Sequence, residues 1–118
     1  MSDAIRNFFA AWGMEDAALR QSTIEEVTGA SFAYTDPNTP DPVATVPAFL
    51  DYIAMFTSNM PGATAEVVDV SAHHGFARAT VDFMRDGATM VRGQYFADLD
   101  DSGAIIRMVG FTGTGEPA

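Results

Sequence analysis

The residues of this chain best suited to chemistry are a phenol and two carboxylates on segments that read as strands. Tyr34 and Asp36 are two positions apart, so on a strand their side chains point to the same side of a sheet. Arg78, Thr80 and Asp82 form a second row with the same spacing. Such a row facing a cavity would mark a site, whereas on the outer side it would be ordinary solvated surface. The pattern leaves both placements open.

We predict that Asp82 is a general base. A carboxylate among apolar side chains has a raised pKa and takes up protons more readily near neutrality. Tyr34 would donate a hydrogen bond to a developing oxyanion, and Asp36 would help to orient the substrate. Each residue also has a structural interpretation. Asp82 could be an exposed strand residue, Tyr34 a core aromatic, and Asp36 the start of an Asp-Pro turn.

Other motifs restrict the chemistry further. Arg78 could anchor an anionic or carbonyl substrate, although pairing with a neighbouring carboxylate is the commoner role of a surface arginine. The sequence contains no cysteine, no metal-binding histidine motif, no nucleophile elbow and no phosphate-binding glycine loop. We therefore expect a protein that uses neither a metal nor a cofactor.

The candidate residues must be positioned by elements that the periodicity predicts. Ile5, Phe8, Phe9 and Trp12 follow the spacing of a helical apolar stripe, and Gly13 is a plausible stop. The remaining expected elements are a helix over 15–26, a strand over 31–36, a loop over 37–42, a helix from the cap Thr45 to Pro61, and strands over 65–73, 76–85, 89–99 and 105–112.

This order predicts an α+β fold in which three N-terminal helices pack on one face of a curved, mostly antiparallel sheet. A chain of 118 residues suits a single domain spanning residues 1–118. The net charge of −10 argues against binding to nucleic acid or anionic membranes, which recruit basic clusters. We see no export signal and no apolar run of about 20 residues, so we expect a cytoplasmic protein.

Several local motifs, taken in order, resemble the SnoaL-like branch of the nuclear-transport-factor-2-like superfamily. The resemblance covers about residues 5 to 113 and rests on the segments 8–12 (FFAAW), 32–37 (FAYTDP), 49–56, 92–96 (RGQYF) and 105–111 (IIRMVGF). It implies a cone-shaped barrel around a hydrophobic cavity and a homodimer formed through the outer sheet face. Activities in the superfamily include polyketide cyclisation, steroid isomerisation, epoxide hydrolysis and plain ligand binding.

The resemblance also carries over some site residues. Limonene epoxide hydrolases of this superfamily end their first strand with a Tyr-x-Asn pair, and Tyr34-Thr35-Asp36 stands at the matching place. Asp82 matches one of their cavity aspartates. Thr80 replaces their cavity arginine, Gly110 their second catalytic aspartate, and Met108 a cavity tryptophan.

Tyr95 occupies a position where many SnoaL-like proteins carry an aspartate, and we expect it to face the pocket. We assign Trp12, Phe49, Phe56 and Met108 to the pocket wall, with Arg78 and Thr80 as further substrate contacts. A wall of aromatic rings and methionines suits a flat, hydrophobic small molecule.

Three functions remain open at this point. The first is a cofactor-independent isomerase, cyclase or hydrolase that uses acid/base chemistry on a hydrophobic substrate. The second is a non-catalytic ligand-binding domain, which the changes at Thr80, Tyr95 and Gly110 favour. The third is a dimeric accessory module that pairs through its outer sheet face.

Overall fold

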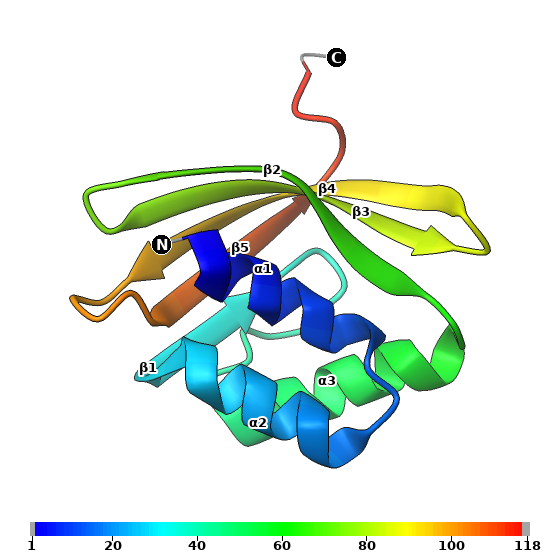
Figure 1. Ribbon diagram of the computed structural model, residues 1–118, viewed down its shortest axis with the longest axis horizontal. Helices are drawn as coiled ribbons and strands as arrows, with labels where there is room; N and C mark the ends of the chain where they lie inside the picture. Colours follow the sequence, from blue (N-terminus) through cyan, green and yellow to red (C-terminus); the bar gives the residue numbers. More distant parts are fainter. Residues whose placement is uncertain (1, 117–118) are drawn as a thin grey trace.

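The computed structural model describes the backbone of residues 2–116 and the side chains of residues 4–116. These residues form helices packed against one curved sheet (Figure 1). In chain order the elements are α1 (Ser2–Ala10), the 3-10 turn η1 (Ala11–Gly13), α2 (Ala17–Val27), β1 (Thr28–Thr35), α3 (Val46–Asn59), β2 (Thr64–His73), β3 (Phe76–Arg85), β4 (Ala88–Leu99) and β5 (Ile105–Thr112).

Side-chain caps set where two of the helices begin. The carboxylate of Asp16 accepts hydrogen bonds from the backbone N–H groups of Ala18 (2.9 Å) and Leu19 (3.2 Å). Asp16 is thus the N-cap of α2, and not part of its first turn as predicted. The Thr45 hydroxyl accepts from the backbone N–H of Ala48 at 3.2 Å, which confirms the predicted cap of α3.

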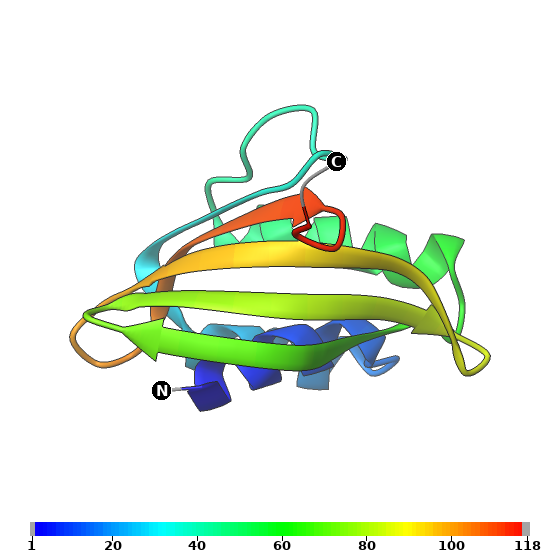
Figure 2. The same ribbon diagram turned by 90° about the horizontal axis from the view of Figure 1, so that it is seen from above.

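The sheet has five strands in the order β1-β5-β4-β3-β2. The pairings are antiparallel except for that of β1 with β5, which is parallel. All helices lie on one side of the sheet, and Figure 2 looks onto the other side, which no helix of residues 2–116 covers. The predicted α+β class and mostly antiparallel sheet are confirmed. Strand β1 begins at Thr28, earlier than predicted, because α2 passes directly into it.

Strand alternation decides which side chains of β3 face the helices. Ala77, Ala79, Val81 and Phe83 are buried on the inner face. The residues between them belong to the outer face. The apolar row faces inward because burying it removes apolar surface from water, whereas burying the polar row would cost hydrogen bonds to solvent.

Aromatic rings fill the space between the helices and the sheet. Phe8 of α1 stacks on Phe49 of α3 with ring centroids 5.1 Å apart, and Phe49 lies 4.8 Å from Tyr34 of β1. All three residues are at most 1% exposed. Burying a side chain of this size contributes about 1.5–3 kcal/mol. This cluster therefore fixes α3 against the end of β1.

Gly110 of β5 pairs with Tyr95 of β4 and leaves room for its ring. A Cβ atom at position 110 would lie 2.4 Å from Cε2 of Tyr95, inside van der Waals contact. The ring of Tyr95 can therefore lie over β5 and contact Phe9 of α1, with ring centroids 4.8 Å apart. The small residue at position 110 and the large one at 95 form one packing unit.

No helix among residues 2–116 combines the length and the apolar character needed to cross a lipid bilayer.

Replacing Gly110 by alanine should destabilise the protein by about 1–3 kcal/mol, because the new methyl group overlaps the Tyr95 ring. Urea unfolding followed by circular dichroism measures this change. In a Tyr95→Ala background the same replacement should be neutral or stabilising, since alanine is better than glycine in an unobstructed strand. An equal cost in both backgrounds would show that the contact with Tyr95 is not the cause.

Candidate functional site

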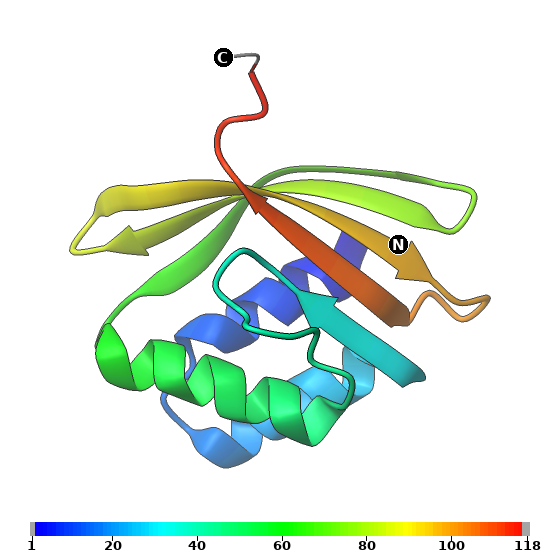
Figure 3. The ribbon, with the colours of Figure 1, turned by 180° about the vertical axis from the view of Figure 1, so that it is seen from behind.

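A pocket of about 200 Å³ opens between α3, the loop after β1 and the inner face of the sheet. Figure 3 presents this side of the molecule, with α3, β1 and its following loop in front of β5. Most of the lining is apolar or aromatic. The lining residues are Trp12, Asp36, Pro37, Asn38, Tyr52, Phe56, Met60, Phe83, Met90, Val91, Arg92, Gly93, Tyr95, Phe111 and Thr112.

The carboxylate of Asp36 is the polar centre of this pocket. It accepts a hydrogen bond of 2.5 Å from the Tyr34 hydroxyl and bonds of 2.8 and 2.9 Å from the Tyr52 hydroxyl. The backbone N–H groups of Asn38 (2.8 Å) and Thr39 (3.2 Å) donate to its Oδ1 atom. These donors come from β1, α3 and the intervening loop, so the carboxylate is held in one orientation.

Local sequence explains how Asp36 reaches this position. Tyr34 and Asp36 share one side of the chain at the end of β1. The segment after Pro37 turns back, so that Tyr34 and Val43 exchange backbone hydrogen bonds of 2.8 Å in both directions. The Asp-Pro turn is therefore present, with Asp36 bonded to the backbone N–H groups that follow it. The same carboxylate holds the turn and bonds to the tyrosines.

The three tyrosines of the chain, Tyr34, Tyr52 and Tyr95, all belong to this site. Burial raises the pKa of the Tyr34 phenol, and Tyr95 and the charge of Asp36 raise it further. Burial raises the pKa of Tyr52 as well, helped by its hydrogen bond to Asp36. Burial also raises the pKa of Tyr95, partly offset by its interaction with Tyr34. All three hydroxyl groups therefore keep their protons at neutral pH.

Trp12 contributes a buried hydrogen-bond donor to the pocket region. The residue is 2% exposed and lines the pocket. Its indole Nε1 has no hydrogen-bond partner within the part of the chain that the structure describes. The ring lies among those of Tyr52, Phe56 and Phe83, at centroid distances of 6.1, 5.3 and 5.5 Å.

The structure brings together several of the residues that the sequence analysis singled out. Trp12, Asp36, Phe56 and Tyr95 line the pocket, and Tyr34 joins them through its hydrogen bond to Asp36.

Phe49 and Met108 were also expected in the pocket wall, but neither lines it. Each is 0% exposed and packs in the core, behind the residues that form the lining.

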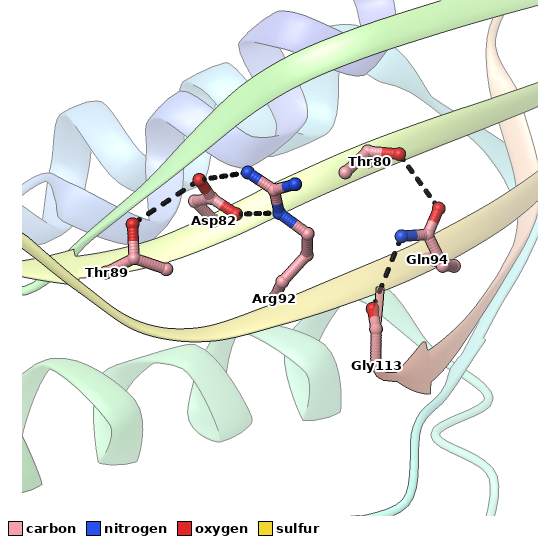
Figure 4. A network of polar contacts seen from close by, with 6 residues as sticks. All are labelled: Thr80, Asp82, Thr89, Arg92, Gln94 and Gly113. Carbon is pink, nitrogen blue, oxygen red and sulfur yellow. Dashed lines mark hydrogen bonds and ion pairs between the residues drawn. The ribbon is translucent and has the colours of Figure 1, made fainter. Parts of the chain in front are cut away.

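The prediction that Asp82 faces the pocket is wrong. Asp82 lies on the outer face of β3, because the inner face is taken by its apolar neighbours. Its carboxylate accepts from Arg92 Nε at 2.5 Å and Nη2 at 2.9 Å, with a longer bond of 3.4 Å from Thr89 (Figure 4). The hydrogen bond with Arg92 lowers the pKa of Asp82, where the sequence analysis expected a raised value. The low exposure of Asp82 comes from these partners on the outer face.

Arg78 and Thr80 lie on the same outer face and likewise do not line the pocket. The Thr80 hydroxyl donates to Gln94 Oε1 on β4 at 2.8 Å (Figure 4), and Arg78 is exposed. Their expected role as substrate contacts is not supported by this placement.

Tyr52 is the member of the site that the sequence analysis missed. It is three residues after Phe49 and four before Phe56, the spacing at which side chains share one face of a helix. The apolar side chains of this helix that pack in or against the core are those of Phe49, Leu50, Ile53 and Phe56, and Tyr52 lies among them in the sequence. Its position on the same face was the available signal.

The raised pKa values predict how the protein responds to alkali. An unfolded tyrosine ionises near pH 10, whereas the folded protein keeps these phenols protonated to higher pH. Their contribution to stability is therefore fully present below about pH 10 and is lost as the pH rises further, because the unfolded state releases its protons first.

Absorbance of phenolate measures this directly, with the chain unfolded in urea as the control. The unfolded chain should titrate near pH 10, and the native protein should show no ionised tyrosine at that pH. Ionisation of any tyrosine of the native protein near pH 10 would contradict the burial described above.

The similarity of this chain to known proteins lies in its fold. No protein-family model matches the chain, and no curated protein sequence matches it. The search of solved structures, in contrast, finds many similar folds.

A proposed isomerase of the SnoaL-like family from Agrobacterium tumefaciens has 21% identity and a TM-score of 0.86, with 95% of this chain and 96% of that chain covered. A proposed SnoaL-like polyketide cyclase from Jannaschia sp. CCS1 has 19% identity and a TM-score of 0.70, covering 93% and 83%. A proposed ketosteroid isomerase from Kribbella flavida has 15% identity and a TM-score of 0.70, covering 98% and 79%. These likenesses confirm the architecture that the sequence resemblance predicts: the chain has the α+β fold of SnoaL-like and nuclear-transport-factor-2-like proteins.

Proposed function

We propose that this domain binds a small hydrophobic molecule in the pocket and isomerises it by acid/base chemistry, with Asp36 as the proton acceptor in place of Asp82. The observation that supports the proposal is the Asp36 carboxylate, which lies in the wall of a largely apolar and aromatic pocket and accepts hydrogen bonds from the hydroxyl groups of Tyr34 and Tyr52. Aromatic walls with a few converging polar groups are typical of small-molecule sites.

The chemistry follows from the protonation states of the site. An Asp36 oxygen would take a proton from the carbon that lies between the substrate carbonyl and a C=C bond. The electron pair of the broken C–H bond would form a new C=C bond to the carbonyl carbon, and the π pair of the carbonyl would move to its oxygen. The protonated Tyr95 hydroxyl would donate to the resulting oxyanion. Asp36 would return the proton to the far carbon of the original C=C bond, while the oxyanion re-forms the carbonyl and the C=C bond shifts by one position, which completes an isomerisation. Tyr34 and Tyr52 would hold the carboxylate in place throughout.

The size of the pocket limits the substrate. Its volume of about 200 Å³ is below the range of roughly 300–1,000 Å³ common for ligand pockets. A molecule of one or two rings is therefore a better candidate than an extended polycyclic compound. The printed descriptions of the similar structures, isomerase and polyketide cyclase, support the reaction class.

Ligand binding without catalysis is the second candidate. Both oxygens of Asp36 already accept hydrogen bonds from four partner residues, which leaves little free acceptor capacity for a substrate proton. The residues at positions 80 and 110 add no further charged group. A purely binding site would need Asp36 only to fix the tyrosines and the loop.

We also propose that two copies of the domain pair through the outer face of the sheet. Phe76, Phe96 and Phe111 are 56%, 45% and 55% exposed, and the rings of Phe96 and Phe111 contact each other at 5.9 Å. Clustered exposed aromatic side chains favour association. On this face Arg92 forms an ion pair with Asp82, and Arg107 forms one with Asp98. These pairs neutralise part of the acidic charge there, which reduces the repulsion between two copies of an acidic chain.

Replacing Asp36 by asparagine tests the proton acceptor. Small cyclic ketones in deuterated water should exchange the hydrogen next to the carbonyl faster with the wild-type protein, as measured by mass spectrometry. The variant should lose about 10²–10⁴-fold of this rate, the usual contribution of general acid/base catalysis.

Asp82→Asn is the matched control and should keep the wild-type rate, because position 82 lies on the other face of the sheet. Thermal unfolding checks that both variants are folded. Equal rates for Asp36→Asn and the wild type would rule out the assignment. Saturable ketone binding without exchange would support the binding function instead.

Light scattering after size exclusion tests the pairing of the outer faces. The wild-type protein should have the mass of a dimer, and Phe96→Glu should have the mass of a monomer because a carboxylate at the centre of the face would be desolvated. Leu19→Glu, at an exposed apolar residue on the helical side, should remain dimeric. A monomeric wild type at high concentration contradicts the proposal.

A further inference from the structure

The indole N–H of Trp12 is a polar group that the proposed chemistry does not use. Trp12 is the one tryptophan of the chain. Its Nε1 atom is buried and without a partner among residues 4–116, while the residue itself lines the pocket. A buried donor left unpaired costs about 1–3 kcal/mol, and such groups are rare in folded proteins.

No neighbour of Trp12 among residues 4–116 places an acceptor within hydrogen-bonding distance of Nε1. Tyr52, Phe56 and Phe83, whose rings pack edge-on against the indole, also line the pocket. The Tyr52 hydroxyl is directed to Asp36. The indole N–H therefore lies among aromatic rings, and a ligand in the pocket could supply the oxygen atom that accepts its hydrogen bond.

Trp12 and Asp36 stand at the same part of the pocket. Both are linked through Tyr52, whose ring lies 6.1 Å from the indole and whose hydroxyl donates to the carboxylate at 2.8 Å. Tyr34, the second donor to Asp36, has its ring 5.9 Å from the indole. Trp12 and Asp36 line the same pocket, so that one ligand in it can contact both residues.

We propose that Trp12 Nε1–H donates a hydrogen bond to a carbonyl oxygen of the ligand, so that the pocket selects small cyclic ketones over hydrocarbons of the same shape. This inference rests on the proposed function, because it names the ligand class of the same site. It gives the carbonyl a donor that remains in place whether or not a proton is transferred. In the reaction, the same bond would strengthen as negative charge develops on the oxygen.

Nuclear magnetic resonance of ¹⁵N-labelled wild-type protein tests the contact without any substitution. A single tryptophan gives a single indole N–H signal, so its assignment is unambiguous. Titration with 1-tetralone should move this proton signal downfield, the direction produced by hydrogen bonding. Tetralin, which has the same two rings and no oxygen, is the matched probe and should not move it downfield.

Affinity measurements on Trp12→Phe give the energetic test. The wild type should bind 1-tetralone about tenfold more tightly than the variant does, the loss of one hydrogen bond. Binding of tetralin should change much less. A general loss of packing in the variant would weaken the binding of both ligands alike. The readout is therefore the ratio of the affinity for 1-tetralone to the affinity for tetralin.

The results separate this inference from the proposed function. Asp36→Asn should slow hydrogen exchange by about 10²–10⁴-fold and keep the downfield shift of the indole signal. An indole signal that responds equally to both compounds, or 1-tetralone that does not bind at all, overturns the ketone assignment. Loss of exchange in Asp36→Asn together with an unmoved indole signal would leave the function standing and remove the role of Trp12.

Discussion

The carboxylate of Asp36 connects elements that are distant along the chain. It accepts hydrogen bonds from Tyr34 at the end of β1, from Tyr52 in the middle of α3, and from two backbone N–H groups of the loop between them. Without this carboxylate, two phenols and a turn would lose their acceptor at the edge of a largely apolar pocket. Leaving such donors unpaired is costly when they are buried. The shape of the pocket mouth and the direction of both hydroxyl groups therefore depend on one side chain.

A second constraint acts from the sheet. Tyr95 of β4 lies over Gly110 of β5, and a side chain at position 110 would overlap its ring. The resemblance described above places an aspartate at position 95 in many SnoaL-like proteins, and one at position 110 in limonene epoxide hydrolases. In this chain the space is filled by one aromatic ring with a protonated hydroxyl. The residues at positions 95 and 110 thus depend on each other, because the glycine makes room for the tyrosine ring.

The fold could be predicted from the sequence because its signals are local. The cap at Thr45, the glycine turns and the alternating strands each depend on a few neighbouring residues. The site was harder to predict for two reasons. The register that brings Gly110 under Tyr95 is a long-range pairing that no local pattern contains. The Asp-Pro turn already explains an aspartate at position 36, so nothing in the local sequence indicates that Asp36 also bonds to Tyr34 and Tyr52.

Asp82 illustrates a different limit. The apolar row of Ala77, Ala79, Val81 and Phe83 indicates which face of β3 is buried, and this pattern alone puts Asp82 outside. The family resemblance pointed the other way, because a cavity aspartate stands at the matching position in some relatives. The hydrophobic pattern was the better guide. Turning Asp82 inward would expose the four apolar side chains to water, and the free energy gained by burying them decides which face of β3 points inward.

The most direct measurement of the central claim is a crystal structure of the protein grown with 1-tetralone. We expect the ketone in the pocket beside α3, with its oxygen next to the indole nitrogen of Trp12 and its ring carbons against the Asp36 carboxylate. A ketone bound on the outer face of the sheet beside Thr80 and Gln94, with the pocket empty, would contradict this expectation.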